Sequence, residues 1–157
     1  MDPEAERKRV LSRAYGLLSV RARSGDEMRR SLRHAGFEDS AIEDAIIHLQ
    51  RQNLLDDQSF AADWVRSRME SRPRGKRLIE HELRVKGIST DDACAATSGV
   101  DDEATALALA ARRAELMRGL DRQTFIRRLA NYLLARGFSR ETVSRAIRSV
   151  LPAPDDS

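Results

Sequence analysis

The sequence is poor in the residues that mark several protein classes. A single cysteine, Cys94, excludes an internal disulfide and any cysteine-rich zinc module. Aromatic residues make up only 4% of the chain, which also has four prolines and eight glycines, a composition that favours helices over a β-sandwich. No apolar run reaches the roughly 18–20 residues of a membrane span, and the charged residues 1–13 lack the apolar stretch of a signal peptide. We therefore expect a soluble, cytoplasmic protein that does not contact membranes.

The sequence also lacks the common patterns of catalysis. It has no glycine-rich phosphate loop, no nucleophile elbow and no set of metal ligands at the usual spacing. His34, His48 and His81 lie far apart, and Cys94 stands among alanines, where we expect a small buried thiol. We predict that the protein is not an enzyme and has no metal site, cofactor or small-molecule substrate. Four aromatic residues lie on apolar stripes and are expected in the core: Tyr15, Phe37, Phe60 and Trp64.

Charge is distributed unevenly, although the net charge is only +3. Residues 38–63 carry seven acids against one base, residues 66–86 carry eight bases against three acids, and residues 112–148 carry ten arginines against three acids. Of the 28 basic residues 25 are arginines, which suits phosphate or carboxylate binding but also follows from a GC-rich genome. The alternation of acidic and basic blocks predicts a protein that docks on charged surfaces in more than one way.

Three segments of the chain share one pattern. A leucine precedes a glycine by four positions, an apolar residue follows the glycine, and another apolar residue comes five later; the glycines are Gly36, Gly87 and Gly137, which lie 51 and 50 positions apart. This pattern predicts a helix closed by a left-handed glycine, with the N-cap of a second helix at Glu38, Ser89 or Ser139. We therefore predict an all-α fold, an elongated tandem array of three-helix, helix-turn-helix-like repeats.

The breaks between helical segments suggest the boundaries of the modules. The pairs Asp56-Asp57 and Asp101-Asp102 are interpreted as caps at helix starts rather than as Mg²⁺ ligands. The first two modules then contain three helices each and the third shows two. The predicted organisation is an N-terminal helix at 1–23, module 1 at 24–72, module 2 at 73–119, C-terminal helical module 3 at 120–151 and a disordered tail at 152–157.

The basic block around Pro73 and Gly75 is the strongest candidate for a binding site, because no acid lies among its cations. Uncompensated like charges at a joint are explained by a polyanion or an acidic partner, although two solvated helix faces and a loop would leave the same pattern. The candidate partner-binding or DNA-binding residues are Arg72, Arg74, Lys76, Arg77, Arg84 and Lys86. A second set consists of Arg127, Arg128, Arg136, Arg140 and Arg145.

The ordered set of these residues resembles the RecX family of regulatory proteins over about residues 11–151. The matching positions include Ala14-Tyr15-Gly16-Leu17-Leu18, Arg23-Ser24, Glu27, Leu32, Gly36-Phe37, Leu55-Asp56-Asp57, Phe60-Ala61, Arg68, Gly75, Ile79, Glu82-Leu83, Lys86-Gly87-Ile88, Leu133 and Arg136-Gly137-Phe138. Met28 stands where the family usually has leucine. Leu78 stands where it usually has arginine, so no arginine contact is carried over to that position.

The resemblance implies that the protein binds the nucleoprotein filament of the RecA recombinase, lies along its groove and inhibits ATP hydrolysis and strand exchange. It thereby implies a role in DNA recombination, DNA repair and the SOS response, with contact to single- or double-stranded DNA left open. An alternative is a stand-alone DNA-binding protein with helix-turn-helix-like modules, although acidic helix starts at Asp56 and Asp101 would repel phosphates. An enzyme of unrecognised type would need a converging acid, base or nucleophile that the sequence does not show.

Overall fold

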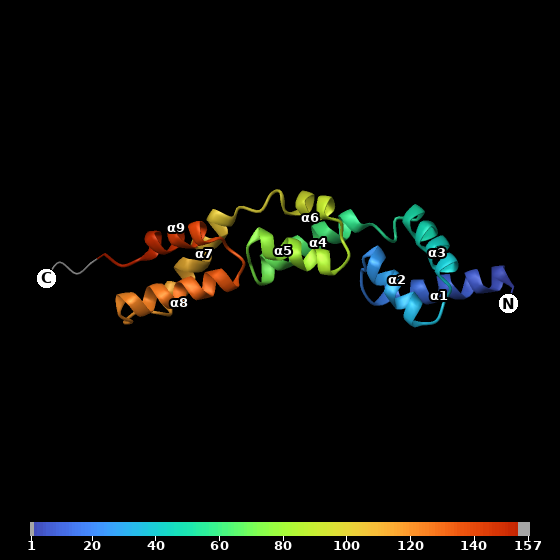
Figure 1. Ribbon diagram of the computed structural model, residues 1–157, viewed down its shortest axis with the longest axis horizontal. Helices are drawn as coiled ribbons and strands as arrows, with labels where there is room; N and C mark the ends of the chain where they lie inside the picture. Colours follow the sequence, from blue (N-terminus) through green and yellow to red (C-terminus); the bar gives the residue numbers. More distant parts are fainter. Residues whose placement is uncertain (1, 154–157) are drawn as a thin grey trace. The chain divides into compact units, whose positions relative to one another are not determined.

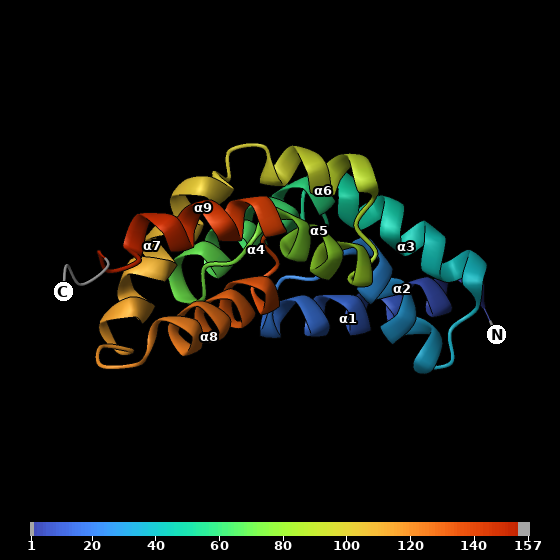
Figure 2. The same cartoon turned by 60° about the vertical axis from the view of Figure 1, so that its left-hand side comes forward.

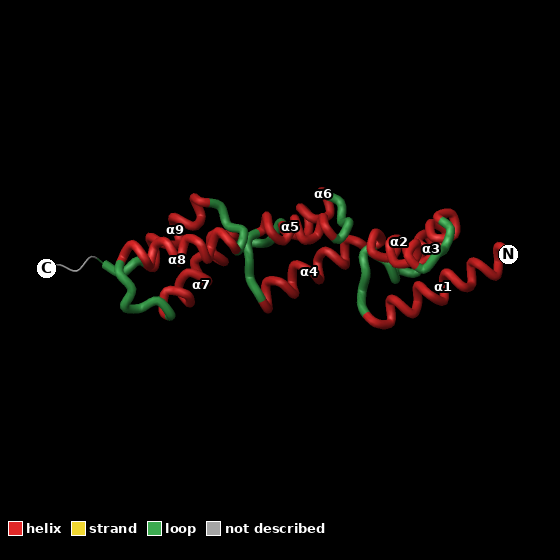
Figure 3. The backbone as a smooth tube through the Cα atoms, turned by 60° about the horizontal axis from the view of Figure 1, so that its bottom comes forward, coloured by secondary structure: helices red, strands yellow, loops and turns green. Residues whose placement is uncertain are grey.

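The computed structural model describes residues 2–153, and within this range it consists of helices and loops without a strand (Figure 3). The helices, labelled in Figure 1, are α1 (Pro3–Val20), α2 (Gly25–His34), α3 (Asp39–Arg51), α4 (Asp57–Ser71), α5 (Lys76–Val85), α6 (Thr90–Thr97), α7 (Asp102–Glu115), α8 (Arg122–Ala135) and α9 (Arg140–Val150). The prediction of an all-α fold is therefore confirmed. Of the expected tail, residues 154–157 lie outside the described range. No helix in that range has the length and apolar character needed to cross a bilayer.

The chain divides into two compact units. The first comprises Met1–Trp64 and Glu82–Ala96, and the second comprises Val65–His81 and Thr97–Ser157. The divisions fall inside α4 and α5 and near the end of α6, so these three helices contribute residues to both units.

The first unit is built around the bundle of α1, α2 and α3, in which each helix contacts the other two. Apolar residues at helical spacing produce this packing: Met28 and Leu32 share one face of α2, and Ile42, Ile46 and Leu49 share one face of α3. Burying such side chains stabilises a bundle by about 1.5–3 kcal/mol each.

The second unit contains the bundle of α7, α8 and α9, which lie together in Figure 2. Its core includes Ala106 and Ala110 from α7, and Leu129 and Leu133 from α8. Small residues on α7 let it approach both neighbours closely. The third bundle therefore has three helices, whereas the sequence pattern showed only two, because α7 packs with the helices that follow it.

The three predicted glycine corners are equivalent in the structure. Gly36, Gly87 and Gly137 have φ angles of +93°, +83° and +89°, the left-handed region that favours glycine. At each corner the residue after the glycine donates its N–H to the carbonyl of the leucine five positions earlier, at 3.2, 3.0 and 3.4 Å. This is the bond of a helix-closing Schellman motif. The prediction of three equivalent corners is confirmed.

Helix starts follow the predicted caps with one exception. Ser89 and Ser139 accept N–H bonds from Asp92 and Thr142, at 3.1 and 3.2 Å, whereas Glu38 makes no side-chain cap bond. Ser24 and Glu27 form the predicted capping box at the start of α2.

The members of each aspartate pair have different roles. Asp56 and Asp101 accept N–H bonds from Ser59 and Ala104 and cap their own helices. Asp57 and Asp102 instead accept backbone N–H bonds from the start of another helix. The interpretation of both pairs as caps is therefore correct for the first aspartate only.

Within the first unit, the start of α2 meets the corner between α5 and α6, a contact that we call joint A. The Ser24 hydroxyl donates to the Lys86 carbonyl at 2.6 Å, and the Gly25 N–H donates to Asp57 Oδ1 at 2.8 Å. A side chain on Gly87 would overlap Asp26. An open N–H group of α2 is thus satisfied by a carboxylate, and the hydroxyl of its cap residue donates to the carbonyl end of another helix.

The second unit repeats this arrangement where the start of α5 meets the corner between α8 and α9, which we call joint B. The Gly75 N–H donates to the Arg136 carbonyl at 2.7 Å, and the Lys76 N–H donates to Asp102 Oδ1 at 2.9 Å. A Cβ on Gly137 would lie 2.5 Å from Cβ of Leu78, and one on Gly75 would overlap the Gly137 carbonyl. Both joints therefore require glycine for close approach.

Helix α8 differs from its counterparts in length. α2 and α5 begin 11 residues before Gly36 and Gly87, whereas α8 begins 15 residues before Gly137. Ile126 lies 11 residues before Gly137 and so corresponds to the first residues of α2 and α5. In α8, one additional turn of helix precedes this residue.

We predict that Gly137→Ala destabilises the protein more than Gly36→Ala does. Both residues have nearly the same φ, so both variants incur about 1–2 kcal/mol of left-handed strain. Only Gly137 faces Leu78, whereas a Cβ on Gly36 meets nothing within 4 Å. Overpacking at joint B should add about 1–3 kcal/mol, measured by urea unfolding. Equal losses for the two variants would contradict the close contact at joint B.

Candidate functional site

The residues most often used in catalysis are dispersed in the structure. His34 and His81 are exposed, and His48 is half-buried. Cys94 is exposed on α6, so the expectation of a buried thiol is wrong: the inward face of this helix carries Ala93 and Thr97, four residues apart. Within residues 2–153, no cluster of three histidine, cysteine or acidic side chains is placed to hold a metal ion.

The four aromatic residues expected in the core differ in how deeply they are buried. Tyr15 is 39% exposed, and its hydroxyl donates to Gln52 Oε1 at 2.8 Å, so the expectation for this residue is wrong. Phe60 is buried as expected, and Phe37 is half-buried against the first core. The half-buried Trp64 ring lies 5.4 Å from Nζ of Lys86.

The first candidate set is divided between the surface and the joints. Arg77 and Arg84 are exposed on α5. Lys76 contributes its backbone N–H to joint B, and Arg74 turns its Nε toward the Arg72 carbonyl at 2.9 Å. These side chains therefore do not converge on one point.

Lys86 contributes to the fold of joint A. Its Nζ lies 3.5 Å from Glu27 Oε2, and Arg21 pairs with the same carboxylate at 2.8 Å. Burial opposes ionisation of Glu27, but hydrogen bonds from Arg21 and the Ser24 N–H, together with the charge of Lys86, outweigh it and hold the pKa of Glu27 below its usual value. Lys86 was predicted to bind a partner, and the structure engages it within the chain.

The C-terminal candidates also fall into different places. Arg145 bridges α9 to α7 through Glu103 at 2.7 Å, with Glu141 at 3.8 Å on its own helix. Arg140 is exposed near it at the start of α9, and Arg127 is exposed on α8.

Arg72 and Arg136, far apart in the sequence, line one groove of about 410 Å³. Its other charged residues include Arg112 and Arg113 from α7, and its only acid is Glu115. We call this the arginine groove; its lining residues are Ser71, Arg72, Pro73, Leu109, Arg112, Arg113, Glu115, Leu116, Tyr132 and Arg136. A neighbouring hollow shares Arg113, Leu116 and Tyr132 with it and extends to Arg128.

Tyr132 organises the arginine groove. The guanidinium carbons of Arg113 and Arg136 lie 4.8 and 5.1 Å from the centre of its ring, within range of cation–π attraction. Arg136 also donates to the Pro73 carbonyl at 3.4 Å. In the described part of the chain, Arg72, Arg112 and Arg113 form no ion pair with a carboxylate. The groove is therefore a preformed, positively charged surface.

The sequence analysis did not select Arg112, Arg113 or Tyr132. Part of the signal was present, because Arg128, Tyr132 and Arg136 recur every four residues and so share one face of α8. The contribution of α7 depends on how it packs against α8, which no local pattern reveals.

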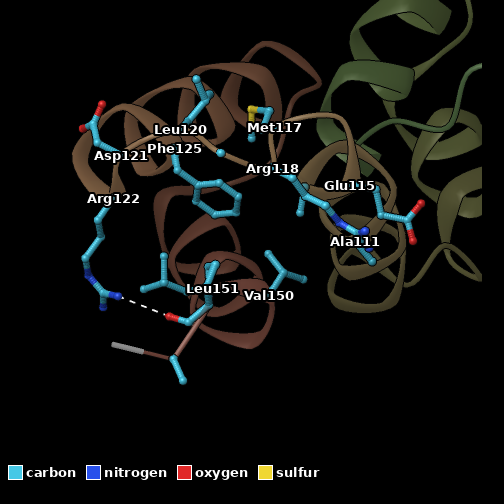
Figure 4. Close-up of a pocket in the computed structure, with 14 residues that line it drawn as sticks. Ala111, Glu115, Met117, Arg118, Leu120, Asp121, Arg122, Phe125, Val150 and Leu151 are labelled. Atoms are coloured by element: carbon cyan, nitrogen blue, oxygen red, sulfur yellow. Dashed lines mark hydrogen bonds between the residues drawn. The ribbon is translucent and has the colours of Figure 1, made fainter. Parts of the chain in front are cut away.

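A second hollow, of about 600 Å³, also borders the end of α7 but lies at the start of α8 (Figure 4). Its walls are mainly apolar and include Met117, Phe125 and Leu151. Arg122 at its rim donates from Nη1 to the Pro152 carbonyl at 3.3 Å, the dashed line in Figure 4. This contact ties the residues after α9 to the start of α8.

Sequence profiles of one family match the chain in three consecutive segments. They are described as the first, second and third three-helix domains of RecX and match residues 11–49, 56–96 and 101–147. Each segment corresponds to one set of three consecutive helices, α1–α3, α4–α6 and α7–α9, and the second and third segments begin at the residue just before α4 and α7.

Relatives and solved structures agree with these matches. The chain is 34% identical over 148 residues to "Regulatory protein RecX" of Prosthecochloris aestuarii, covering 94% of this chain and 97% of the relative. It is 32% identical to the protein of the same name from Amycolatopsis mediterranei, covering 96% and 88%. The crystal structure of RecX from Lactobacillus salivarius superimposes with a TM-score of 0.85 at 23% identity over 94% of this chain and 97% of that one.

We predict that Glu27→Gln lowers the stability of the protein at neutral pH and reduces its acid sensitivity. Because the folded-state pKa of Glu27 is lowered, its contribution is present above the ordinary carboxyl pKa of 4.5 and is lost as pH falls through the folded value. The cost at pH 7 should be about 1–2 kcal/mol by urea unfolding.

The exposed Glu115, which has no ion pair in the described residues, offers a matched control in Glu115→Gln. This variant should unfold like the wild type at every pH. A wild-type protein and a Glu27→Gln variant with the same stability at neutral pH would contradict the role of this carboxylate.

Proposed function

The chain belongs to the RecX family of regulatory proteins, and from this premise we propose that it binds the RecA nucleoprotein filament and inhibits its ATPase and strand-exchange activities. The observation that carries the proposal is the match of all three RecX domains, in order, to a chain in which both joints are formed. The protein then acts by binding rather than by catalysis. Its place of action is the cytoplasm, in DNA recombination, repair and the SOS response.

The distribution of charge supports binding to a polyanionic assembly. Arg77 and Arg84 are exposed on α5, and the arginine groove adds cations from α7 and from the residues that follow α4 and α8. Positive surfaces of this kind raise the rate of association with negatively charged partners and make it dependent on salt. Cations that the fold already engages, such as Lys86 and Arg145, are not part of the proposed surface.

The acidic starts of α4 and α7 disfavour stand-alone recognition of duplex DNA. Asp56 and Asp101 cap these helices, and Asp57 and Asp102 are occupied at the joints. A recognition helix approaches bases with its N-terminal residues, where carboxylates would meet phosphates. Direct contact of other surfaces with DNA within the filament is compatible with the proposal.

We predict that the protein inhibits ATP hydrolysis by RecA on single-stranded DNA. Titration of the protein into preformed filaments should lower the steady-state rate of phosphate release. Unchanged hydrolysis at stoichiometric protein would contradict the proposed function. Tight, sequence-specific binding to naked duplex DNA at physiological salt would favour the stand-alone DNA-binding alternative instead.

We predict that the double variant Arg74→Glu/Arg77→Glu inhibits the filament about tenfold less well, equivalent to about 1.4 kcal/mol of binding free energy. Its melting temperature should stay close to that of the wild type, because Arg77 is exposed. Arg7→Glu/Arg13→Glu, an equal charge reversal at two exposed positions of α1, is the matched control. A large fall in melting temperature would show that the pair is structural rather than part of the binding surface.

A further inference from the structure

We propose that the arginine groove is a docking site for an acidic peptide segment that carries an apolar side chain. The proposal goes beyond filament binding in naming the chemistry of the segment and the residues that receive it. It rests on the proposed function only for the identity of the protein that supplies the segment.

The charge of the groove selects an acidic ligand. Arg72, Arg112 and Arg113 are exposed and lack carboxylate partners in the described residues, and the groove contains one acid, Glu115. A guanidinium offers forked donors that match a carboxylate in geometry, and three of them along one groove suit a row of acidic side chains.

An apolar anchor lies among these cations. Leu116 is 77% exposed at the end of α7, yet it lines both the arginine groove and the neighbouring hollow. Met117 and Tyr132 lie beside it in that hollow. Leucine, methionine and tyrosine surrounded by arginines form the mixed composition found at protein–protein interfaces, where an apolar centre has a polar rim.

The same features disfavour a nucleic acid as the ligand of this groove. Single strands are held by free aromatic faces on which bases stack, whereas the Tyr132 ring is already engaged by two guanidiniums. A phosphodiester backbone would leave Leu116 exposed to water. An acidic segment with one apolar residue uses both the cations and the leucine.

Tyr132 and the Pro73 carbonyl hold the site in place before a ligand arrives. Arg136 contacts both of these groups, and Arg113 packs against the same ring. Less conformational freedom is then lost on binding, because two of the long side chains are already positioned. Arg112 has no such support and is free to follow the ligand.

The test uses direct binding to the full-length protein, with no recombinase present. A short fluorescent peptide of glutamates and leucines is compared with one in which serine replaces each leucine, and with oligothymidylate. We expect the leucine-containing peptide to bind most tightly by fluorescence anisotropy at physiological salt. Arg112→Glu should weaken its binding about tenfold, and Leu116→Ser should weaken it about fivefold.

Both substitutions have matched controls in the same unit. Leu107→Ser removes a 43% exposed leucine from α7 outside the groove, and Arg148→Glu reverses an exposed charge on α9. Neither control should change peptide binding. A Leu116→Ser variant that behaves like Leu107→Ser would overturn the inference, because the apolar anchor would then be unused.

Two further outcomes separate this inference from the proposed function. If oligothymidylate binds more tightly than the peptides, and Arg112→Glu abolishes that binding, then the groove binds nucleic acid and the inference is overturned. Peptide binding with the expected losses, in a protein that leaves RecA hydrolysis unchanged, would support the inference while contradicting the proposed function.

Discussion

The structure depends on the pairing of helix ends at the two joints. The first N–H groups of a helix have no partner within it, and its N-terminus carries partial positive charge. At joint A, the start of α2 receives the Lys86 carbonyl and the Asp57 carboxylate, and at joint B the start of α5 receives the Arg136 carbonyl and Asp102. In both joints an aspartate accepts a helix N–H and a corner carbonyl accepts a second bond, from a hydroxyl at joint A and from a backbone N–H at joint B, so one pairing of helix ends connects successive modules.

Much of the local structure could be predicted because its causes lie within a few residues. The corner glycines follow from a left-handed helix end, and the Ser24 capping box from a three-residue spacing. The joints could not be predicted, because Ser24 and Lys86 are 62 positions apart. Such distant contacts also determine the different roles of Asp56 and Asp57, and they determine that α7 becomes the third helix of the last bundle. The residue boundaries assigned to the modules stay a prediction.

The candidate site was predicted in part. Composition and charge blocks indicated Arg72 and Arg136, but assigned them to separate clusters. The structure brings them together because the residues after α4 lie against the end of α8, where Arg136 donates to the Pro73 carbonyl. Charge alone could not distinguish cations at the surface from Lys86, which pairs with Glu27 inside joint A. Such a distinction requires the positions of carboxylates that are remote in sequence.

The additional turn of α8 has a consequence for how such proteins can grow by duplication. At the position where α2 and α5 present open N–H groups, α8 presents Ile126, which is preceded by a complete turn of its own helix. A fourth three-helix module fused after α9 would therefore meet a helix whose N–H groups at this level already form hydrogen bonds within α8. The third bundle therefore does not offer, at this level of α8, the open donors that take part in joints A and B. Lengthening the series would require the insertion of a new copy upstream of it, or the removal of one turn from α8.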